Sequence, residues 1–125
     1  MHFDTPRPTI AVVIPNHNDS AFLSACLESV LQQSVHPDQI IFVDDLSSDD
    51  SLSKAHLLLD GVDGVAILAN DSCLGTMGAI NEGLKQVWCD YVLFLASNDY
   101  LIERSEEHTS ELQSHHDLVC RLLLE

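Results

Sequence analysis

The stretch IIFVDDLSSDD, residues 40–50, runs from four apolar residues straight into a pair of acids. An unbroken apolar run of this length is typical of a strand that is buried on both faces of a sheet. Asp44 and Asp45 then stand side by side where the strand ends. Neighbouring carboxylates repel each other unless hydrogen-bond donors or a cation offset their charges. The pair therefore favours a ligand with N–H donors, or a divalent metal, at this end of the strand. Asp49 and Asp50, further along, are interpreted as helix-capping acids.

Strands and helices alternate on both sides of this stretch. Short apolar runs predict strands, and apolar residues spaced three and four apart predict helices. The strands are expected over residues 9–15, 40–45, 65–70 and 91–99, and the helices within 21–33, 46–60 and 76–88. The last helix is expected to bury one apolar stripe, made of Met77, Ile80, Leu84, Val87 and Trp88. Such alternation predicts an α/β, Rossmann-like fold, in which a mostly parallel sheet carries helices on both faces.

Polar residues stand at the end of each predicted strand, namely Asn16-His17-Asn18, Asp44-Asp45, Asn70-Asp71 and Asn98-Asp99. Parallel strands end at the same edge of a sheet, which is where such folds bind ligands. Hard cations such as Mg²⁺ and Mn²⁺ take oxygen ligands and share them with substrate phosphates, so Asn98-Asp99 is a candidate cation site, with a plain turn as the alternative. Taken alone, His17 is equally consistent with a loop residue and Asn18 with a helix cap. The convergence of all four strand ends is what predicts a site.

Composition limits the kinds of partner. The chain has 125 residues, room for one domain, with 20 acids against 5 bases and a formal net charge of −15. Such a surface repels phosphate backbones and anionic lipids, which argues against nucleic-acid binding. A phosphorylated ligand would need a cation or backbone amides to offset its charge. The 4 cysteines form no CxxC pair, and the chain shows no apolar signal or membrane segment, so a cytoplasmic protein with reduced thiols is expected.

The two ends of the chain differ from its middle. Residues 1–8 are interpreted as a lead-in and residues 9–103 as the domain. The segment 104–125, RSEEHTSELQSHHDLVCRLLLE, has an apolar end compatible with a final amphipathic helix. Its string, however, resembles the conceptual translation of a common short-read sequencing adapter. We therefore expect an artefactual tail, and a sheet whose edge at the fourth strand is left open.

Four segments of the chain resemble the family 2 glycosyltransferases, which have the GT-A fold. AVVIPNHNDSAFLSACLESVLQQS is similar to their opening strand and helix, and IIFVDDLSSDDS to their second strand with its acidic pair. NDSCLGTMGAINEGL is similar to their segment that usually starts and ends with Asn-x-Gly, here with Asn81-Glu82-Gly83 at its end, and YVLFLASNDYL to the strand that bears a DxD-type metal motif. The resemblance spans residues 9–102 in the family's order. It implies the N-terminal, nucleotide-sugar-binding half of a GT-A fold.

The resemblance also implies roles for individual residues. Asp45 matches the carboxylate that hydrogen-bonds the nucleotide base, typically the uracil N–H. Pro15 and His17 match the loop that lines the base pocket. Asp44 matches the first acid of the pair, with a structural or ribose-facing role. Asp99 matches the aspartate that holds the divalent cation, Mg²⁺ or Mn²⁺, which bridges the donor's diphosphate.

This chain departs from the family pattern around the metal motif. The family carries acids where this chain has Ala96 and Asn98, so Asp99 alone remains as a charged ligand, with the carbonyl oxygen of Asn98 as a weaker partner. The family's general base and acceptor region lie downstream of this motif, so no catalytic residue is assigned within residues 1–103.

For an intact parent, the resemblance implies inverting transfer from a nucleotide-diphospho-sugar, with a UDP-sugar favoured, to the hydroxyl of an unidentified acceptor. The chain as given is expected to bind the donor at best. The alternatives are an inert truncated fragment and a phosphoacceptor receiver-like signalling domain. The second fits less well, because its acidic pair would follow the first strand rather than the second.

Overall fold

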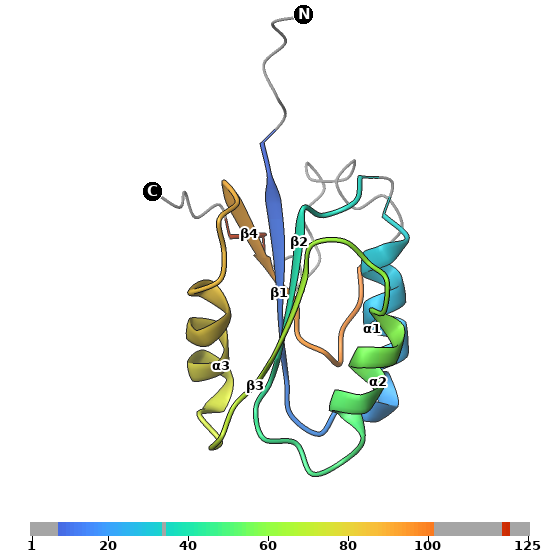
Figure 1. The fold of residues 1–125 in the computed structure, drawn as a ribbon, viewed down its shortest axis with the longest axis vertical. Helices are drawn as coiled ribbons and strands as arrows, with labels where there is room; N and C mark the ends of the chain where they lie inside the picture. Colours follow the sequence, from blue (N-terminus) through green and yellow to red (C-terminus); the bar gives the residue numbers. More distant parts are fainter. Residues whose placement is uncertain (1–7, 34, 102–118, 121–125) are drawn as a thin grey trace, which may run out of the picture.

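The structure is a computed structural model that describes residues 8–33, 35–101 and 119–120. Strands and helices alternate along these residues (Figure 1), in the order β1 (Ile10–Asn16), α1 (Ser20–Leu31), β2 (Gln39–Asp44), α2 (Ser51–Leu58), β3 (Val65–Ala69), α3 (Gly75–Leu84), β4 (Tyr91–Phe94) and β5 (Val119–Cys120). The predicted order of strands and helices is therefore confirmed as far as β4. No helix among the described residues is both long and apolar enough to span a membrane.

The strands form one sheet in the order β3-β2-β1-β4-β5. The pairs among β1, β2, β3 and β4 are parallel, and β5 pairs antiparallel with β4. Helices α1 and α2 cover one face and α3 covers the other (Figure 1). This is the predicted Rossmann-like α/β arrangement, with the carboxyl ends of β1 and β2 in register, Asn16 opposite Asp44.

The edge of β4 is not open, contrary to our expectation. Val119 and Cys120 pair with Leu93 and Val92, so two residues of the segment 104–125 add a short strand there. Pairing satisfies backbone groups that an exposed edge would leave to solvent. The other residues of that segment lie outside the described residues. The expectation of an artefactual tail is therefore not tested by the structure.

The central strands are buried on both faces because each face has its own apolar cluster. Along β1, Val12 and Ile14 face α1 and α2, whereas Ala11 and Val13 face α3, which is the two-residue alternation of a strand. Every residue of β2 is buried. Two buried faces explain why the sequence of both strands is apolar without interruption.

Two predicted boundaries at the C-terminal side of the domain are wrong. Strand β4 ends at Phe94, although the amides of Leu95 and Ser97 still donate to β1. Helix α3 ends at Leu84, and the predicted stripe is only partly correct, because Leu84 and Val87 pack against the apolar cluster on this face whereas Met77 and Trp88 are 68% and 66% exposed. Ala79 and Gly83, which are small enough to bring the helix close to the sheet, form the buried face instead.

Candidate functional site

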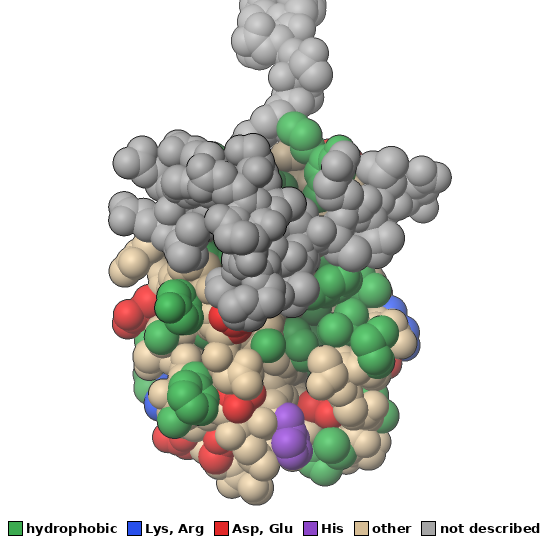
Figure 2. Space-filling model, turned by 180° about the vertical axis from the view of Figure 1, so that it is seen from behind, with side chains coloured by type: hydrophobic (Ala, Val, Ile, Leu, Met, Phe, Trp, Pro, Cys, Tyr) green, Lys and Arg blue, Asp and Glu red, His purple; other side chains and the backbone are tan. Residues whose placement is uncertain are grey.

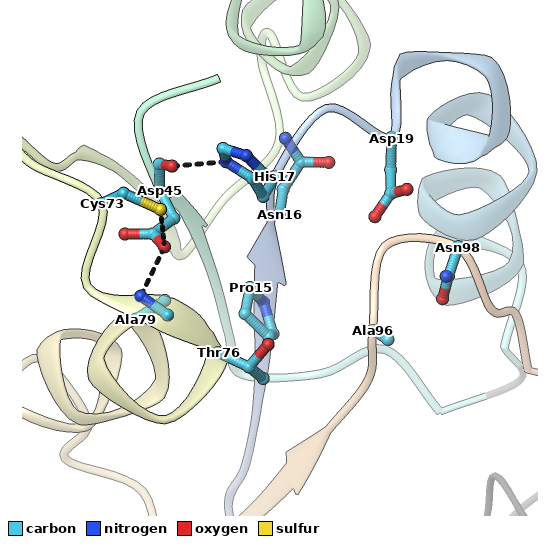
Figure 3. Close-up of a pocket in the computed structure, with 11 residues that line it drawn as sticks. Pro15, Asn16, His17, Asp19, Asp45, Cys73, Thr76, Ala79, Ala96 and Asn98 are labelled. Carbon is cyan, nitrogen blue, oxygen red and sulfur yellow. Dashed lines mark hydrogen bonds between the residues drawn. The ribbon is translucent and has the colours of Figure 1, made fainter. Parts of the chain in front are cut away.

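A cavity of about 280 Å³ lies at the edge of the sheet where β1, β2 and β4 end (Figure 3). Its wall comes from the end of β1 and the turn after it, the residue after β2, the start of α3 with the loop before it, and the loop after β4: Pro15, Asn16, His17, Asp19, Asp45, Cys73, Gly75, Thr76, Ala79, Ala96 and Asn98. The structure thus brings together most of the predicted site residues, namely Pro15, His17, Asp45 and Asn98. Asp44 and Asp99 are not among the lining residues. In Figure 2, acidic side chains and a histidine are visible at this end of the molecule.

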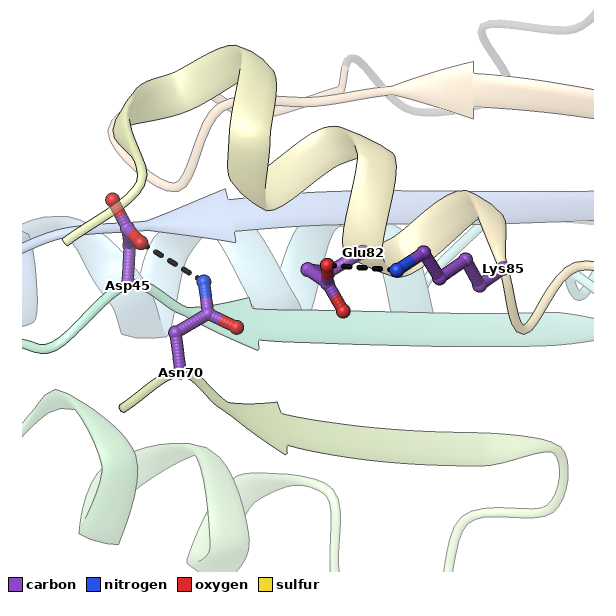
Figure 4. Close-up of polar contacts among 4 residues, drawn as sticks. All are labelled: Asp45, Asn70, Glu82 and Lys85. Carbon is purple, nitrogen blue, oxygen red and sulfur yellow. Dashed lines mark hydrogen bonds and ion pairs between the residues drawn. The ribbon is translucent and has the colours of Figure 1, made fainter. Parts of the chain in front are cut away.

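Asp45 is 3% exposed, and its carboxylate binds the start of α3. Oδ1 accepts hydrogen bonds from the amide of Leu74 at 2.8 Å and from Nδ2 of Asn70 at 2.9 Å (Figure 4). Oδ2 accepts from the amide of Gly75 at 2.9 Å and from the thiol of Cys73 at 3.4 Å (Figure 3). A thiol is a weak donor. Of the two partners of Asp45 that line the cavity, Gly75 and Cys73, the thiol of Cys73 is therefore the weaker.

These contacts decide the charge of Asp45. Burial by itself would raise the pKa of its carboxyl group. The hydrogen bonds from Leu74, Asn70, Cys73 and Gly75 favour the ionised form and outweigh burial, so the pKa lies below its ordinary value of 3.8. A negative charge is thus held in the cavity wall at neutral pH.

The turn after β1 is tied to the turn after β2. Nδ1 of His17 lies 2.7 Å from the carbonyl oxygen of Asp45, and Oδ1 of Asn18 accepts a hydrogen bond from the amide of Ser48 at 2.7 Å. Asn18 has φ of 57° and Leu46 has φ of 58°, in the left-handed region, which asparagine tolerates better than leucine. Backbone strain at Leu46 therefore lies directly beside the buried carboxylate of Asp45.

The first acid of the pair has a structural position. Asp44 is 4% exposed, and it accepts hydrogen bonds from Nδ2 of Asn16 at 2.9 Å and from the amide of Ser47 at 3.1 Å. These contacts join the ends of β1 and β2. They also leave Oδ1 of Asn16, a buried atom of a residue that lines the cavity, without a hydrogen-bond partner among the described residues. A buried acceptor left this way requires an explanation, such as a ligand.

Asp19, from the turn before α1, and Asn98, from the loop after β4, both project toward the cavity (Figure 3). Asp19 is the N-cap residue of α1, but its side chain makes no capping hydrogen bond. Its Oδ2 instead accepts from the hydroxyl of Ser97 at 2.8 Å, which holds the carboxylate beside the loop that carries Asn98. Asp99, the predicted cation ligand, accepts a hydrogen bond from the amide of Tyr100 at 2.8 Å.

Sequence reasoning missed several residues of the wall, and among these Asp19 and Cys73 carry a carboxylate and a thiol. Asp19 stands at the start of α1, where an acid ordinarily caps the helix, and because it does not do so its carboxylate can face the cavity. Cys73 was expected only as one of the reduced thiols, yet it is exposed and lines the cavity. Asp49 does hold helix starts as expected, since it accepts from the amides of Ser20 and Ser51.

The described cysteines should differ sharply in reactivity. Burial raises the pKa of the Cys26 thiol from 9.0 to about 12, and the charges of Asp99 and Asp19 add to this effect. Because the thiolate is the reactive form, we expect Cys26 to react with iodoacetamide at pH 8 at least ~100-fold more slowly than exposed Cys73. Peptide mapping by mass spectrometry measures both rates. Equal labelling of the folded chain would contradict the burial of Cys26.

Comparisons with known proteins bear on the fold and the family. The model of the family described as glycosyl transferase family 2 matches residues 11–120. A PGL/p-HBAD biosynthesis glycosyltransferase of Mycobacterium tuberculosis is 30% identical over 96 residues, which are 77% of this chain and 38% of that protein. A poly(ribitol-phosphate) beta-glucosyltransferase of Bacillus spizizenii is 33% identical over 95 residues, 74% of this chain and 15% of that protein.

Solved structures show the same fold. The mannosyltransferase PcManGT from Pyrobaculum calidifontis, in complex with GDP-Man and Mn²⁺, has a TM-score of 0.75 at 18% identity and covers 89% of this chain. S. aureus TarS in complex with UDP has a TM-score of 0.71 at 24% identity and covers 86% of this chain. The chain spans 34% and 33% of those two chains, and no more than 38% of the two curated relatives.

Proposed function

The chain belongs to glycosyl transferase family 2, and we propose that it binds a nucleoside-diphosphate sugar in the cavity at the carboxyl edge of its sheet. The observation that carries this proposal is the buried, ionised carboxylate of Asp45 in the cavity wall. Family membership argues against the phosphoacceptor alternative.

The base of the nucleotide is assigned to the side of the cavity formed by Asp45 and Cys73. Oδ2 of Asp45 keeps its amide contact with Gly75, and the thiol at 3.4 Å is its weakest partner. A ring N–H of a base is a stronger donor than a thiol, so it can replace Cys73 at this oxygen. Uracil has such an N–H, and one structure of the same fold was solved with UDP. Guanine also has a ring N–H, and PcManGT was solved with GDP-Man, so our preference for a UDP-sugar rests on the family pattern, in which this carboxylate typically binds the uracil N–H.

The diphosphate requires positive charge that the cavity wall does not supply. The described residues include two lysines, and neither lines the cavity. Lys54 donates to the carbonyl oxygen of Ser20 at 2.8 Å, and Lys85 pairs with Glu82 at 3.0 Å (Figure 4). A divalent cation is the remaining way to offset the donor's charge, apart from backbone amides.

The oxygen atoms of the wall fit a hard cation. Asp19, Asn98 and Asn16 line the same cavity, and Oδ1 of Asn16 is buried without a hydrogen-bond partner among the described residues. Oxygen donors of this kind suit Mg²⁺ or Mn²⁺. When bound, the cation would neutralise charge on the diphosphate leaving group. Asp19 and Asn98 would hold it, with Asp99 as the alternative ligand suggested by the family pattern.

For the whole protein we propose inverting transfer of the sugar to an acceptor hydroxyl. A general base removes the hydroxyl proton in such a reaction. None of the cavity residues is assigned this role, and the relatives are far longer than this chain. The activity of this polypeptide is therefore proposed as donor binding, with an inert fragment as the alternative.

Titration calorimetry with UDP tests this proposal. We expect saturable binding that Mn²⁺ tightens about tenfold or more, equivalent to ~1.4 kcal/mol. Asp19→Asn should remove most of the Mn²⁺ effect, whereas Asp63→Asn, at an exposed turn, should leave it unchanged. If Asp99→Asn removes the effect and Asp19→Asn does not, the cation is held by Asp99. If UDP gives no saturable heat at any Mn²⁺ concentration, the chain is the inert alternative.

A further inference from the structure

We propose that His17, Asp45 and Cys73 form a binding site for a thiophilic divalent cation of the Zn²⁺ class. Each residue offers one ligand atom, a ring nitrogen, a carboxylate oxygen and a sulfur, and these atoms all lie within 4.8 Å of one another (Figure 3). They come from three separate segments, the turn after β1, the residue after β2 and the loop before α3. The fold therefore assembles a nitrogen, oxygen and sulfur donor set at one side of the cavity.

The spacing of these atoms suits tetrahedral zinc. Zinc binds sulfur at about 2.3 Å and nitrogen or oxygen at about 2.0 Å, so neighbouring ligands of a tetrahedron lie roughly 3.3–3.6 Å apart. Sγ of Cys73 lies 3.4 Å from Oδ2 of Asp45. The exposed side chains of His17 and Cys73 can close the remaining gap by small rotations. Three protein ligands leave the fourth position open to water or to a substrate group.

The charges balance when the cation binds. Cys73 now donates its S–H to Asp45. On binding, the thiol gives its proton to solvent, and the cation takes the place of that proton between the sulfur and Oδ2. The divalent charge offsets the thiolate and the carboxylate, which would otherwise repel each other. Asp45 keeps its hydrogen bonds from the amides of Leu74 and Gly75, which hold the carboxylate in position.

His17 is held in a way that resembles metal-binding histidines. Its Nδ1 lies 2.7 Å from the carbonyl oxygen of Asp45, and a proton on Nδ1 leaves the lone pair of Nε2 for a metal. Nε2 now contacts Nδ2 of Asn18 at 3.3 Å, a long hydrogen bond at an exposed site. Replacing this contact with a metal bond costs little.

This site differs from the hard-cation site proposed around Asp19 and Asn98. Sulfur and imidazole ligands favour Zn²⁺, whereas an all-oxygen set favours Mg²⁺ or Mn²⁺. The two sites line different sides of one cavity (Figure 3). A Zn²⁺ ion on Oδ2 of Asp45 would occupy the position assigned above to the base of the nucleotide. Micromolar Zn²⁺ should therefore compete with UDP, a consequence that rests on the proposed function, although the metal site itself does not.

Protection of Cys73 from alkylation tests the site directly. The whole chain is treated with iodoacetamide with and without Zn²⁺, and peptide mapping follows the labelling of Cys73 alone, so that other cysteines and histidines of the chain do not contribute. We expect Zn²⁺ to slow the labelling of Cys73 at least tenfold, and Mg²⁺ to have no effect. His17→Gln should abolish protection, whereas His36→Gln, at an exposed histidine elsewhere, should retain it.

Two outcomes overturn the inference: Zn²⁺ leaves the labelling rate of Cys73 unchanged, or His17→Gln is protected as well as the unaltered chain. Co²⁺ provides a second readout, because thiolate ligation produces a charge-transfer absorption band that Cys73→Ser should remove. Neither readout needs a nucleotide. Protection of Cys73 by Zn²⁺ without UDP binding would uphold the metal site and refute the donor pocket. UDP binding without protection by Zn²⁺ would uphold the donor pocket and refute the metal site.

Discussion

Asp45→Asn is expected to lower the free energy of unfolding at pH 7 by about 2–4 kcal/mol and to abolish the binding of UDP. The buried carboxylate accepts from the amides of Leu74 and Gly75, which start α3, and from Nδ2 of Asn70. Asparagine keeps one oxygen and turns an NH₂ group toward the remaining donors. At least one buried N–H then loses its acceptor, and the charge that strengthens the other bonds is lost.

Asp44→Asn is the matched control for this prediction. Asp44 is an equally buried carboxylate one residue away, but it binds Asn16 and Ser47 and does not line the cavity. Its variant should also lose stability yet bind UDP within a few-fold of the unaltered chain. Urea unfolding and calorimetry, at a temperature where both variants are folded, separate the two effects. If both variants lose UDP equally, Asp45 has no specific role in binding.

The difference in the free energy of unfolding between the unaltered chain and Asp45→Asn should become smaller as the pH falls. The folded-state pKa is lowered below the ordinary value of 3.8, so the carboxylate contributes stability that is complete above that value. The contribution disappears as the pH falls through the lowered pKa. The free energies of unfolding of the unaltered chain and of Asp45→Asn should therefore converge as the pH is lowered below about 4. A difference that grows in acid would contradict the assigned direction.

The position of the site could be predicted because it follows from topology. Parallel strands place their carboxyl ends at one edge, so Asn16, Asp45 and Asn98 were expected to meet there, and they line one cavity. The uninterrupted apolar sequence of β2 likewise indicated burial on both faces. Such inferences depend only on strand order and on the alternation of side chains.

The details of the wall depend on contacts between distant segments, which sequence patterns do not encode. Asp19 faces the cavity because Ser97, from the loop after β4, binds its carboxylate. Cys73 lies in the wall because Asp45 draws the start of α3 toward the end of β2. The pairing of Val119–Cys120 with β4 is a contact of the same long-range kind.

Helix α3 was predicted, but part of its buried stripe was wrong for a related reason. Helical spacing of apolar residues predicted burial of Met77 and Trp88, but both are exposed. The helix instead packs through Ala79 and Gly83, whose small size is not recorded by a hydrophobic pattern. Helix α3 requires small residues that let it lie close to the sheet, and not a large apolar surface.

Gly83→Val is therefore expected to lower the free energy of unfolding by about 3 kcal/mol. A Cβ at Gly83 would lie 2.7 Å from Cγ1 of Val13 and 3.1 Å from Cγ2 of Val43. Both valines are fully buried in central strands, so they have no room to move away. Gly83→Ala should also destabilise, because overpacking of about 1–3 kcal/mol exceeds the gain of roughly 1 kcal/mol in helix propensity.

Asn81→Ala, on the exposed side of the same helix, is the control. It should leave stability unchanged or raise it by up to about 0.7 kcal/mol, because only helix propensity changes there. Urea unfolding of the three variants measures these differences. Since the start of α3 supplies the amides that bind Asp45, Gly83→Val should weaken UDP binding as well, even where the protein is folded. If Gly83→Ala is as stabilising as Asn81→Ala, then α3 lies farther from the sheet than described, and its amides are not held against Asp45 by packing.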